Sequence, residues 1–152
     1  MKEVGNRMQF WQVAMRPGKP LAFGAMKGVP LFGLPGNPVS SMVSFEQFVR
    51  PSILKMMGRR NLFRRIVRAL LTETIEKKKG VRHFVRARVA FEDGHYRAVS
   101  TGEQGSGILK SMVQANGLIV LPENATSVKA GETVAVQLLD ASLMLAGQPE
   151  YP

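Results

Sequence analysis

The stretch Leu-Pro-Gly-Asn-Pro-Val-Ser at residues 34–40 decides the fold of the first part of this chain. It lies between an apolar, β-favouring run at 29–33 and a segment at 39–49 whose apolar side chains recur at helical spacing. Asn37 suits the residue that caps a helix, and Pro38 suits the first helical position, where a fixed φ helps and no N–H is needed. The stretch therefore predicts a strand, a tight turn and a helix in succession.

A turn of this kind is suited to holding an anion. The start of a helix presents unpaired backbone N–H groups and the positive end of the helix dipole, and oxyanions bind there. Gly36 lets a ligand approach the backbone, while Ser40 and Ser41 could add hydroxyl donors. There is no Gly-Lys-Ser/Thr ending, so the turn is not a Walker loop. Taken alone, the string is equally compatible with an ordinary strand–helix connection, because these are common turn residues.

The surrounding elements predict an α/β portion over residues 1–57. We expect a strand within 8–16 that ends at Pro17-Gly18, and a hairpin over 22–33. Pro51 should kink or interrupt the helix, and Gly58 should end it. Such a portion is too short for a complete α/β domain, which needs strand–helix–strand crossovers. Either the chain is truncated or its sheet is completed by a partner, and truncation is the simpler expectation.

Residues 58–152 predict a small β-rich domain. The arginine-rich stretch at 59–68 should be mainly solvated surface, and its buried members are expected to be Leu62, Phe63, Ile66 and Val67. From residue 81 the hydrophobic period changes to two, which is typical of a strand. The remaining elements are expected as a hairpin over 81–99, a short helix at 105–115, and strands at 117–121 and 133–139.

Charge and composition limit the class of protein. The chain has 21 Lys+Arg, 11 Asp+Glu and no cysteine, which leaves a net charge of +10 and excludes disulfides and thiolate metal sites. This charge attracts anionic partners of any kind. No apolar run approaches the roughly 18–20 residues that span a bilayer, and no secretory signal precedes the first strand. We expect a cytoplasmic protein with no membrane partner.

Several motifs together resemble the MoeA/gephyrin E-domain family. Met-Arg-Pro-Gly-Lys-Pro at 15–20, Phe23-Gly24 and the turn at 33–40 follow that family's order and spacing. The segments at 101–107, 116–122 and 130–132 resemble its C-terminal β domain. The resemblance covers nearly the whole chain. It implies the C-terminal part of a MogA-like molybdopterin-binding α/β domain, followed by a small β-rich, barrel-like domain.

The resemblance also implies a function in molybdenum cofactor biosynthesis. Enzymes of this family are molybdopterin molybdenumtransferases, which insert molybdate into adenylylated molybdopterin (molybdopterin-AMP) and release AMP with the help of a divalent metal such as Mg²⁺. Gln12 departs from the pattern, because some relatives have a lysine there. The substrate-binding residues implied for this chain are Arg16, Lys19, Pro35, Gly36, Asn37, Pro38, Ser40, Arg86 and Ser106.

Strand alternation gives a separate expectation for one of these residues. If Val85, Ala87 and Val89 face the core of the second domain, Arg86 and Arg88 should face outward. Arg86 would then be available to a ligand.

The metal half of such a site is missing from the sequence. Before residue 58 the acidic residues are Glu3 and Glu46, which offer no carboxylate pair for Mg²⁺. The resemblance implies that the acidic catalytic residues lie upstream and that a homodimer completes the active site. We therefore expect this chain to carry anion-binding groups, with no metal ligand and no activity alone.

Two alternatives remain open. One is a basic module that binds nucleic acid, which would need aromatic side chains interleaved with cations. Phe84, between Arg82 and Arg86, offers the only such cluster, so this alternative ranks low. The other is a scaffold that docks a partner peptide, as the likeness to gephyrin suggests.

Overall fold

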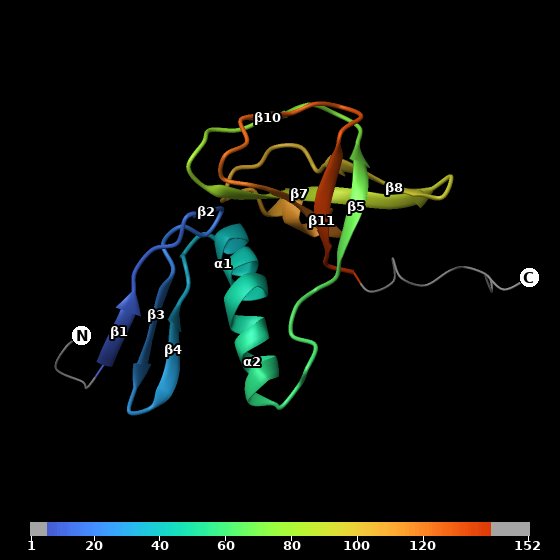
Figure 1. The fold of residues 1–152 in the computed structure, drawn as a ribbon. Helices are drawn as coiled ribbons and strands as arrows, with labels where there is room; N and C mark the ends of the chain where they lie inside the picture. The colour runs from blue at the N-terminus through green and yellow to red at the C-terminus, as the bar shows by residue number, and fades with distance from the viewer. Residues whose placement is uncertain (1–5, 141–152) are drawn as a thin grey trace, which may run out of the picture. The chain divides into compact units, whose positions relative to one another are not determined.

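A computed structural model describes residues 6–140 of the chain (Figure 1). The described residues form two compact units. The first unit comprises the residues up to Phe63 together with Gly105–Leu109, and the second comprises Arg64–Gln104 and the residues from Lys110 onward. Over the described range, no helix has the length and apolar character needed to cross a membrane.

The first unit contains an antiparallel sheet. Its strands are β1 (Asn6–Phe10), β3 (Ala22–Met26) and β4 (Val29–Gly33), in the order β1-β3-β4. The hairpin predicted over 22–33 is confirmed, and its turn places Lys27 and Gly28 at φ 50° and 82°, as a type I′ turn requires. The strand predicted within 8–16 is divided into β1 and the two-residue β2 (Met15–Arg16).

The predicted helix runs without a break from Pro38 to Met56. It consists of α1 (Pro38–Ser44), a π-helical turn η2 (Phe45–Val49) and α2 (Arg50–Met56). Pro51 therefore does not interrupt the helix. The N–H of Arg50 donates to the carbonyl of Phe45, one residue further back than in an α-helix. This wider turn lets the helix continue although Pro51 has no N–H to donate.

Gly58 ends the helix, as predicted. Its φ is +74°, and its N–H donates to the carbonyl of Lys55 at 3.0 Å. The N–H of Arg59 donates to the carbonyl of Leu54 at 2.9 Å. These two bonds make a Schellman motif, in which a left-handed residue closes the last helical turn.

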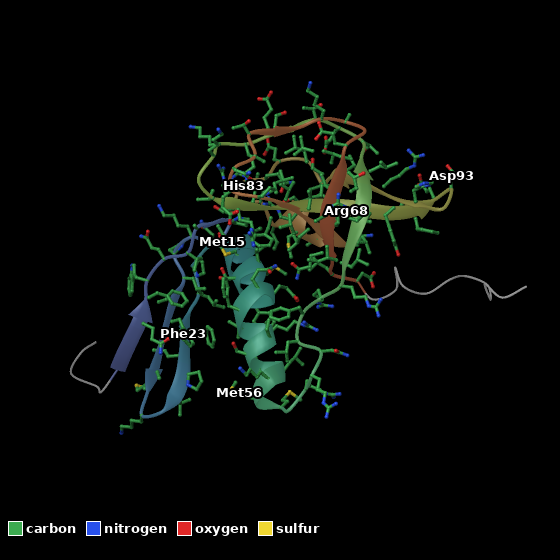
Figure 2. The ribbon with its side chains drawn as sticks, in the orientation of Figure 1. Met15, Phe23, Met56, Arg68, His83 and Asp93 are labelled. Carbon is green, nitrogen blue, oxygen red and sulfur yellow. The ribbon has the colours of Figure 1, made fainter. Side chains whose placement is uncertain are left out.

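One face of the sheet packs against the helix through aromatic side chains. Phe23, labelled in Figure 2, lies with its ring centroid 5.5 Å from that of Phe10 and 4.8 Å from that of Phe32. These three rings, with Phe48 and Pro51 of the helix, line a cavity of about 470 Å³. Burial of this face fixes the helix, and with it the turn at the helix start.

The second unit is a closed β-barrel. Its strands follow the order β7-β8-β5-β11-β9, and β9 pairs back with β7. The inward side chains, among them Val85, Ala87, Ile119 and Val136, form a single core. The strands are β5 (Ile66–Leu71), β7 (Arg82–Glu92), β8 (His95–Ser100), β9 (Gly117–Leu121) and β11 (Thr133–Leu138).

Most strands of the barrel agree with the sequence-based expectations. Those at 81–99, 117–121 and 133–139 are confirmed, whereas β5 and the short pair β6 (Ile75–Glu76) and β10 (Ser127–Val128) were not predicted. The expected helix at 105–115 is reduced to α3 (Leu109–Val113), because Gly105 and Gly107 disfavour helix in its first part.

The burial predicted within the arginine-rich stretch is partly wrong. Phe63 and Ile66 are 74% and 62% exposed. The phase of β5 explains the exposure of Ile66, because Ala69 and Leu71 point into the barrel and Val67 packs against that core. A strand that directs these residues inward must direct Ile66 and Arg68 outward.

We predict that Gly18→Ala destabilises the first unit. Gly18 has a φ of +104°, and a Cβ there would lie 2.5 Å from Ser44 Oγ and 2.9 Å from Met15 Cε. Strain and overlap together should lower the free energy of unfolding by about 2–4 kcal/mol. Trp11 is the single tryptophan of the chain, so its fluorescence during urea unfolding reports on this unit.

Gly28→Ala is the matched control. Gly28 also has a positive φ, of +82°, but a Cβ there would meet no atom within 4 Å. Only the strain of about 1–2 kcal/mol applies to it. Equal losses in the two variants would show that the contact of Gly18 with Ser44 contributes nothing.

Candidate functional site

The turn at residues 34–40 has the predicted strand–turn–helix geometry. It leaves β4 and enters α1, with Asn37 at the N-cap in an extended conformation (φ −71°, ψ 125°) and Pro38 at the helix start. The N–H of Ser41 donates to the carbonyl of Asn37 at 2.9 Å. The side chain of Asn37, however, makes no capping hydrogen bond. The N–H groups of the first helical turn are therefore not satisfied by the residue that normally caps them.

Asn37 instead contacts Ser106, a residue of the same compact unit. Its Nδ2 donates to Ser106 Oγ at 3.0 Å, although the two residues are 69 positions apart in the chain. A hydroxyl that accepts one hydrogen bond keeps its own proton for another acceptor. The structure thus brings together two residues predicted for the site, and leaves Ser106 able to donate to an oxyanion.

The other residues of the turn have distinct places. Gly36 is exposed, and a Cβ at this position would meet no atom within 4 Å, so the backbone is open to a ligand. Ser40 is only 4% exposed. The hydroxyl of Ser41 donates to the carbonyl of Pro35. The serine hydroxyls that were expected to face a ligand are thus buried or used within the turn.

A second turn carries the two predicted cations. Arg16 and Lys19 are exposed, while Pro17 and Gly18 between them are buried. The carbonyl of Lys19 accepts from the N–H groups of Val13 and Leu21, each at 3.0 Å. These backbone hydrogen bonds hold the turn together, and its two cationic side chains lie in solvent.

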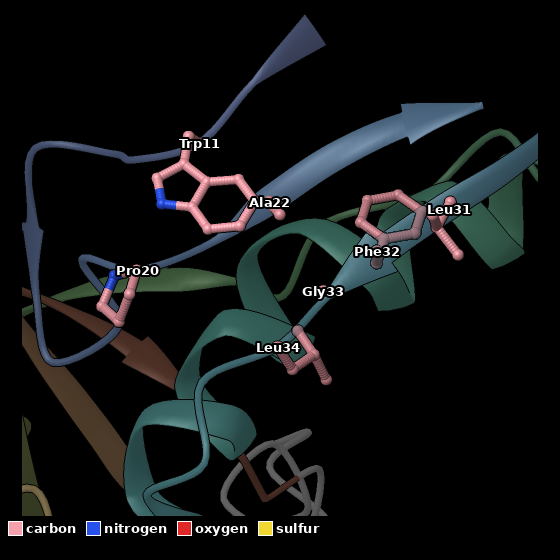
Figure 3. A pocket seen from close by; sticks show the side chains of 7 residues that line it. All are labelled: Trp11, Pro20, Ala22, Leu31, Phe32, Gly33 and Leu34. Carbon is pink, nitrogen blue, oxygen red and sulfur yellow. The ribbon is translucent and has the colours of Figure 1, made fainter. Parts of the chain in front are cut away.

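The two turns border one hollow in the first unit (Figure 3). Pro20, which follows Lys19, and Leu34, which precedes Pro35, both line a cavity of about 380 Å³. Trp11 lies over this cavity and is 60% exposed. Trp11 was not among the residues predicted for the site. Its position as a large aromatic residue directly after a short strand was the one feature of the sequence that could have indicated this role.

The first unit is strongly cationic. Between residues 6 and 63 there is one acidic residue, Glu46, which lies 3.9 Å from Arg50 in an ion pair. Its field therefore favours anions. The cations of the same range are Arg7, Arg16, Lys19, Lys27, Arg50, Lys55, Arg59 and Arg60.

The described residues do not fit an Mg²⁺ site. Within residues 6–140 no group of three or more His, Asp or Glu side chains is placed to hold a metal ion. Mg²⁺ prefers near-octahedral coordination by hard oxygen ligands. Glu46, the one carboxylate described in the first unit, is paired with Arg50 and lies on η2.

Arg86 lies on the opposite side of β7 from the core residues Val85, Ala87 and Val89, as predicted, but the expected exposure of its side chain is wrong. Arg86 is 0% exposed, while Arg88 is exposed as predicted. The guanidinium of Arg86 donates to the carbonyls of Glu103 (3.1 Å) and Gln104 (3.3 Å) and to Ser111 Oγ (2.9 Å). Alternation fails as a guide here because other parts of the same unit cover this side of β7, so that the whole run 84–87 is buried.

The side chain of Gln104 also binds the backbone of β7. Its Oε1 accepts from the N–H of Arg86 at 2.8 Å, and its Nε2 donates to the carbonyl of Arg86 at 3.2 Å. The side chains of Arg86 and Gln104 therefore hold residues 103–104 against β7. A direct contact of Arg86 with a ligand stays a prediction.

Comparisons with known proteins agree with this division of the chain. Residues 68–139 match the family model described as "MoeA C-terminal region (domain IV)", and residues 1–55 match "Probable molybdopterin binding domain". The chain belongs to the MoeA family, as a C-terminal portion. This confirms the predicted family and fold class: a MogA-like segment followed by the β-rich domain.

Relatives of this MoeA-family chain include a molybdopterin molybdenumtransferase of Haemophilus influenzae, 37% identical over 139 residues, which cover 90% of this chain and 34% of that protein. Molybdopterin molybdenumtransferase 2 of Mycobacterium tuberculosis is 39% identical over 85% of this chain and 31% of its own length. The chain spans about a third of the length of these curated relatives.

A solved structure shows the same fold. The molybdopterin biosynthesis MoeA protein of Pyrococcus horikoshii superposes with a TM-score of 0.75 at 32% identity, covering 92% of this chain and 34% of that chain. The two alternatives, a nucleic-acid module and a partner-docking scaffold, receive no support from these matches.

We predict that Arg86→Met destabilises the barrel. It would leave two part-buried carbonyls and the buried Ser111 hydroxyl without this donor, which should lower the free energy of unfolding of the second unit by about 2–5 kcal/mol. Thermal unfolding followed by circular dichroism measures this loss.

Arg88→Met on the same strand is the matched control. Its exposed side chain should change the free energy of unfolding by no more than about 0.5 kcal/mol. If both variants unfold at the wild-type temperature, the hydrogen bonds of Arg86 do not stabilise the barrel.

Proposed function

We propose that this chain supplies the anion-binding part of a molybdopterin molybdenumtransferase site, which inserts molybdate into adenylylated molybdopterin and releases AMP. The observation that carries the proposal is the uncapped helix start at Asn37, joined through its side chain to the Ser106 hydroxyl. The curated relatives, named molybdopterin molybdenumtransferases, and the molybdopterin-binding family model support it. The cationic charge of the first unit adds to the case.

In this proposal the chain binds and orients oxyanions. The backbone N–H groups of Gly36 and Asn37, both exposed residues, and the Ser106 hydroxyl donate to oxygens of a phosphate or molybdate. The Arg16 guanidinium offers two parallel N–H donors, and Lys19 adds a mobile point charge. Pro35 and Pro38 fix the turn, so the donors need no reorganisation when the anion arrives. Orientation and charge neutralisation are contributions that such groups make to group transfer.

In this proposal, residues outside the described part of the chain supply the other groups that the reaction needs. Mg²⁺ is held by acidic residues outside the described part of the chain, and the working assembly is a homodimer of a longer protein in the cytoplasm. The chain alone then binds oxyanions but does not release AMP. Molybdate- and Mg²⁺-dependent AMP release by the isolated chain would contradict this division of roles.

We predict that Gly36→Val weakens oxyanion binding at least tenfold without unfolding the chain. The added Cβ projects into open space, where the valine side chain blocks approach of a ligand to the backbone. Isothermal titration with molybdate and, separately, with AMP shows which oxyanion the turn prefers. A folded variant with unchanged affinity for both would show that the turn has only a structural role.

We predict that Lys19→Ala weakens molybdate binding several-fold more than Lys55→Ala does. Both lysines are exposed cations of the first unit, so each substitution removes the same charge from its field. Lys19 adjoins the cavity shared by the two turns, whereas Lys55 lies in the last turn of α2. Equal losses of molybdate affinity in the two variants at low salt would mean that binding depends only on the net charge of the first unit.

A further inference from the structure

The end of α2 and the loop after it expose a group of large apolar side chains. Met56, labelled in Figure 2, and Met57 are each 63% exposed, Ile53 is 40% exposed and Phe63 is 74% exposed. All four residues belong to the first unit. Met56, Met57 and Phe63 lie between the two matched regions, which are residues 1–55 and 68–139. The two family models therefore do not account for these side chains.

Exposed cations alternate with these apolar side chains. Lys55, Arg59 and Arg60 are exposed residues of the same stretch. Between Glu46 and Glu73 the sequence contains no Asp or Glu, so no carboxylate of this stretch neutralises the cations. We define the helix-end patch as Ile53, Lys55, Met56, Met57, Arg59, Arg60 and Phe63.

Hydrogen bonds fix the backbone that carries the helix-end patch. The N–H groups of Gly58 and Arg59 donate to carbonyls of the last helical turn. Arg50 Nη1 donates to the carbonyl of Leu62 at 3.1 Å, which holds the loop beside the helix. Leu62 at this attachment is half-buried, whereas its neighbour Phe63 is exposed. The apolar side chains of the patch are therefore presented to solvent by an ordered backbone.

We propose that the helix-end patch binds the surface of an anionic phospholipid bilayer. Its apolar side chains enter the boundary between headgroups and acyl chains, as those of interfacial helices do. Arg59 and Arg60 bind lipid phosphates through paired N–H donors, and Lys55 reaches a headgroup on its long apolar stem. The sequence-based expectation of no membrane partner rested on spanning runs and secretory signals, and a surface contact needs neither.

Other partners fit the helix-end patch less well. A second copy of the chain would bring two cationic first units together, and these repel each other. Single-stranded nucleic acid offers phosphates, but its bases stack on aromatic side chains, and Phe63 is the one aromatic residue of the patch. Methionine side chains are flexible and apolar, which suits a fluid acyl boundary. The inference does not depend on what the turn at 34–40 binds.

The first experiment measures co-sedimentation of the 152-residue chain with lipid vesicles. We expect the chain to bind vesicles with about one third phosphatidylglycerol in phosphatidylcholine at least tenfold more tightly than pure phosphatidylcholine. Raising the salt concentration should weaken this binding, because salt screens the attraction between the cations and the headgroups. A chain of net charge +10 is attracted to any anionic surface, so variants must separate the patch from the overall field.

Phe63→Ala and Phe91→Ala form a matched pair of variants. Phe91 lies on β7 of the second unit and is 56% exposed. Neither substitution changes the charge of the chain. We expect Phe63→Ala to weaken binding to the anionic vesicles about fivefold or more, because an aromatic side chain no longer enters the bilayer. Phe91→Ala should leave this binding unchanged.

A second experiment detects insertion of the patch directly. The chain has no cysteine, so one introduced cysteine can carry a fluorophore that brightens in an apolar environment. We expect brightening on anionic vesicles for the fluorophore on Met57→Cys, and none for the fluorophore on Val99→Cys, a 39% exposed position of β8.

Three results would overturn the proposal. The first is the absence of binding to anionic vesicles, and the second is an equal loss of binding in the two phenylalanine variants. The third is a vesicle-bound chain whose fluorophore on Met57→Cys does not brighten. Binding of a single-stranded oligonucleotide that depends on Phe63, with no vesicle binding, would assign the helix-end patch to nucleic acid instead.

Discussion

The hydrogen bond from Asn37 to Ser106 is the interaction on which the candidate site depends. An asparagine at the start of a helix ordinarily accepts from an amide of the first turn, and this cap contributes about 1 kcal/mol. Here the side chain is directed to a serine hydroxyl 69 residues away. The helix therefore lacks this stabilising cap, and the Ser106 hydroxyl keeps its proton for another acceptor. An uncapped helix start in a cationic unit is physically matched to an oxyanion.

The placement of the cations depends on a contact that only glycine allows. Ser44 Oγ is fully buried, has no hydrogen-bond partner among the described residues, and lies 2.5 Å from the position that a Cβ of Gly18 would take. This close approach seats the turn of Arg16 and Lys19 on the last residue of α1. The buried part of the turn is apolar and tightly packed, while both cationic side chains extend into solvent. The same helix thus follows the turn at residues 34–40 and supports the basic turn.

The burial of Arg86 could not be predicted from its residue type or from its place in the strand. A buried guanidinium needs several acceptors, and two backbone carbonyls and a serine hydroxyl provide them. These bonds fix residues 103–104, close in sequence to Ser106. Arg88, two residues further along the strand, is exposed. The family resemblance implied a ligand contact for Arg86, which stays a prediction, and alternation could not reveal its burial.

The sequence by itself determined the features set by local chemistry. The hairpin turn at Lys27-Gly28, the helix start at Asn37-Pro38, the helix end at Gly58 and the period-two strands follow from allowed backbone angles and hydrophobic spacing. Other features needed partners distant in the chain. The β5 strand forms from an arginine-rich stretch because its neighbours in the barrel bury Ala69 and Leu71, and the π turn before Pro51 keeps a helix intact across a proline. Only the tertiary structure decided that Asn37 meets Ser106 and that Arg86 is buried, because hydrogen-bond partners and strand cover are set by packing between segments far apart in sequence.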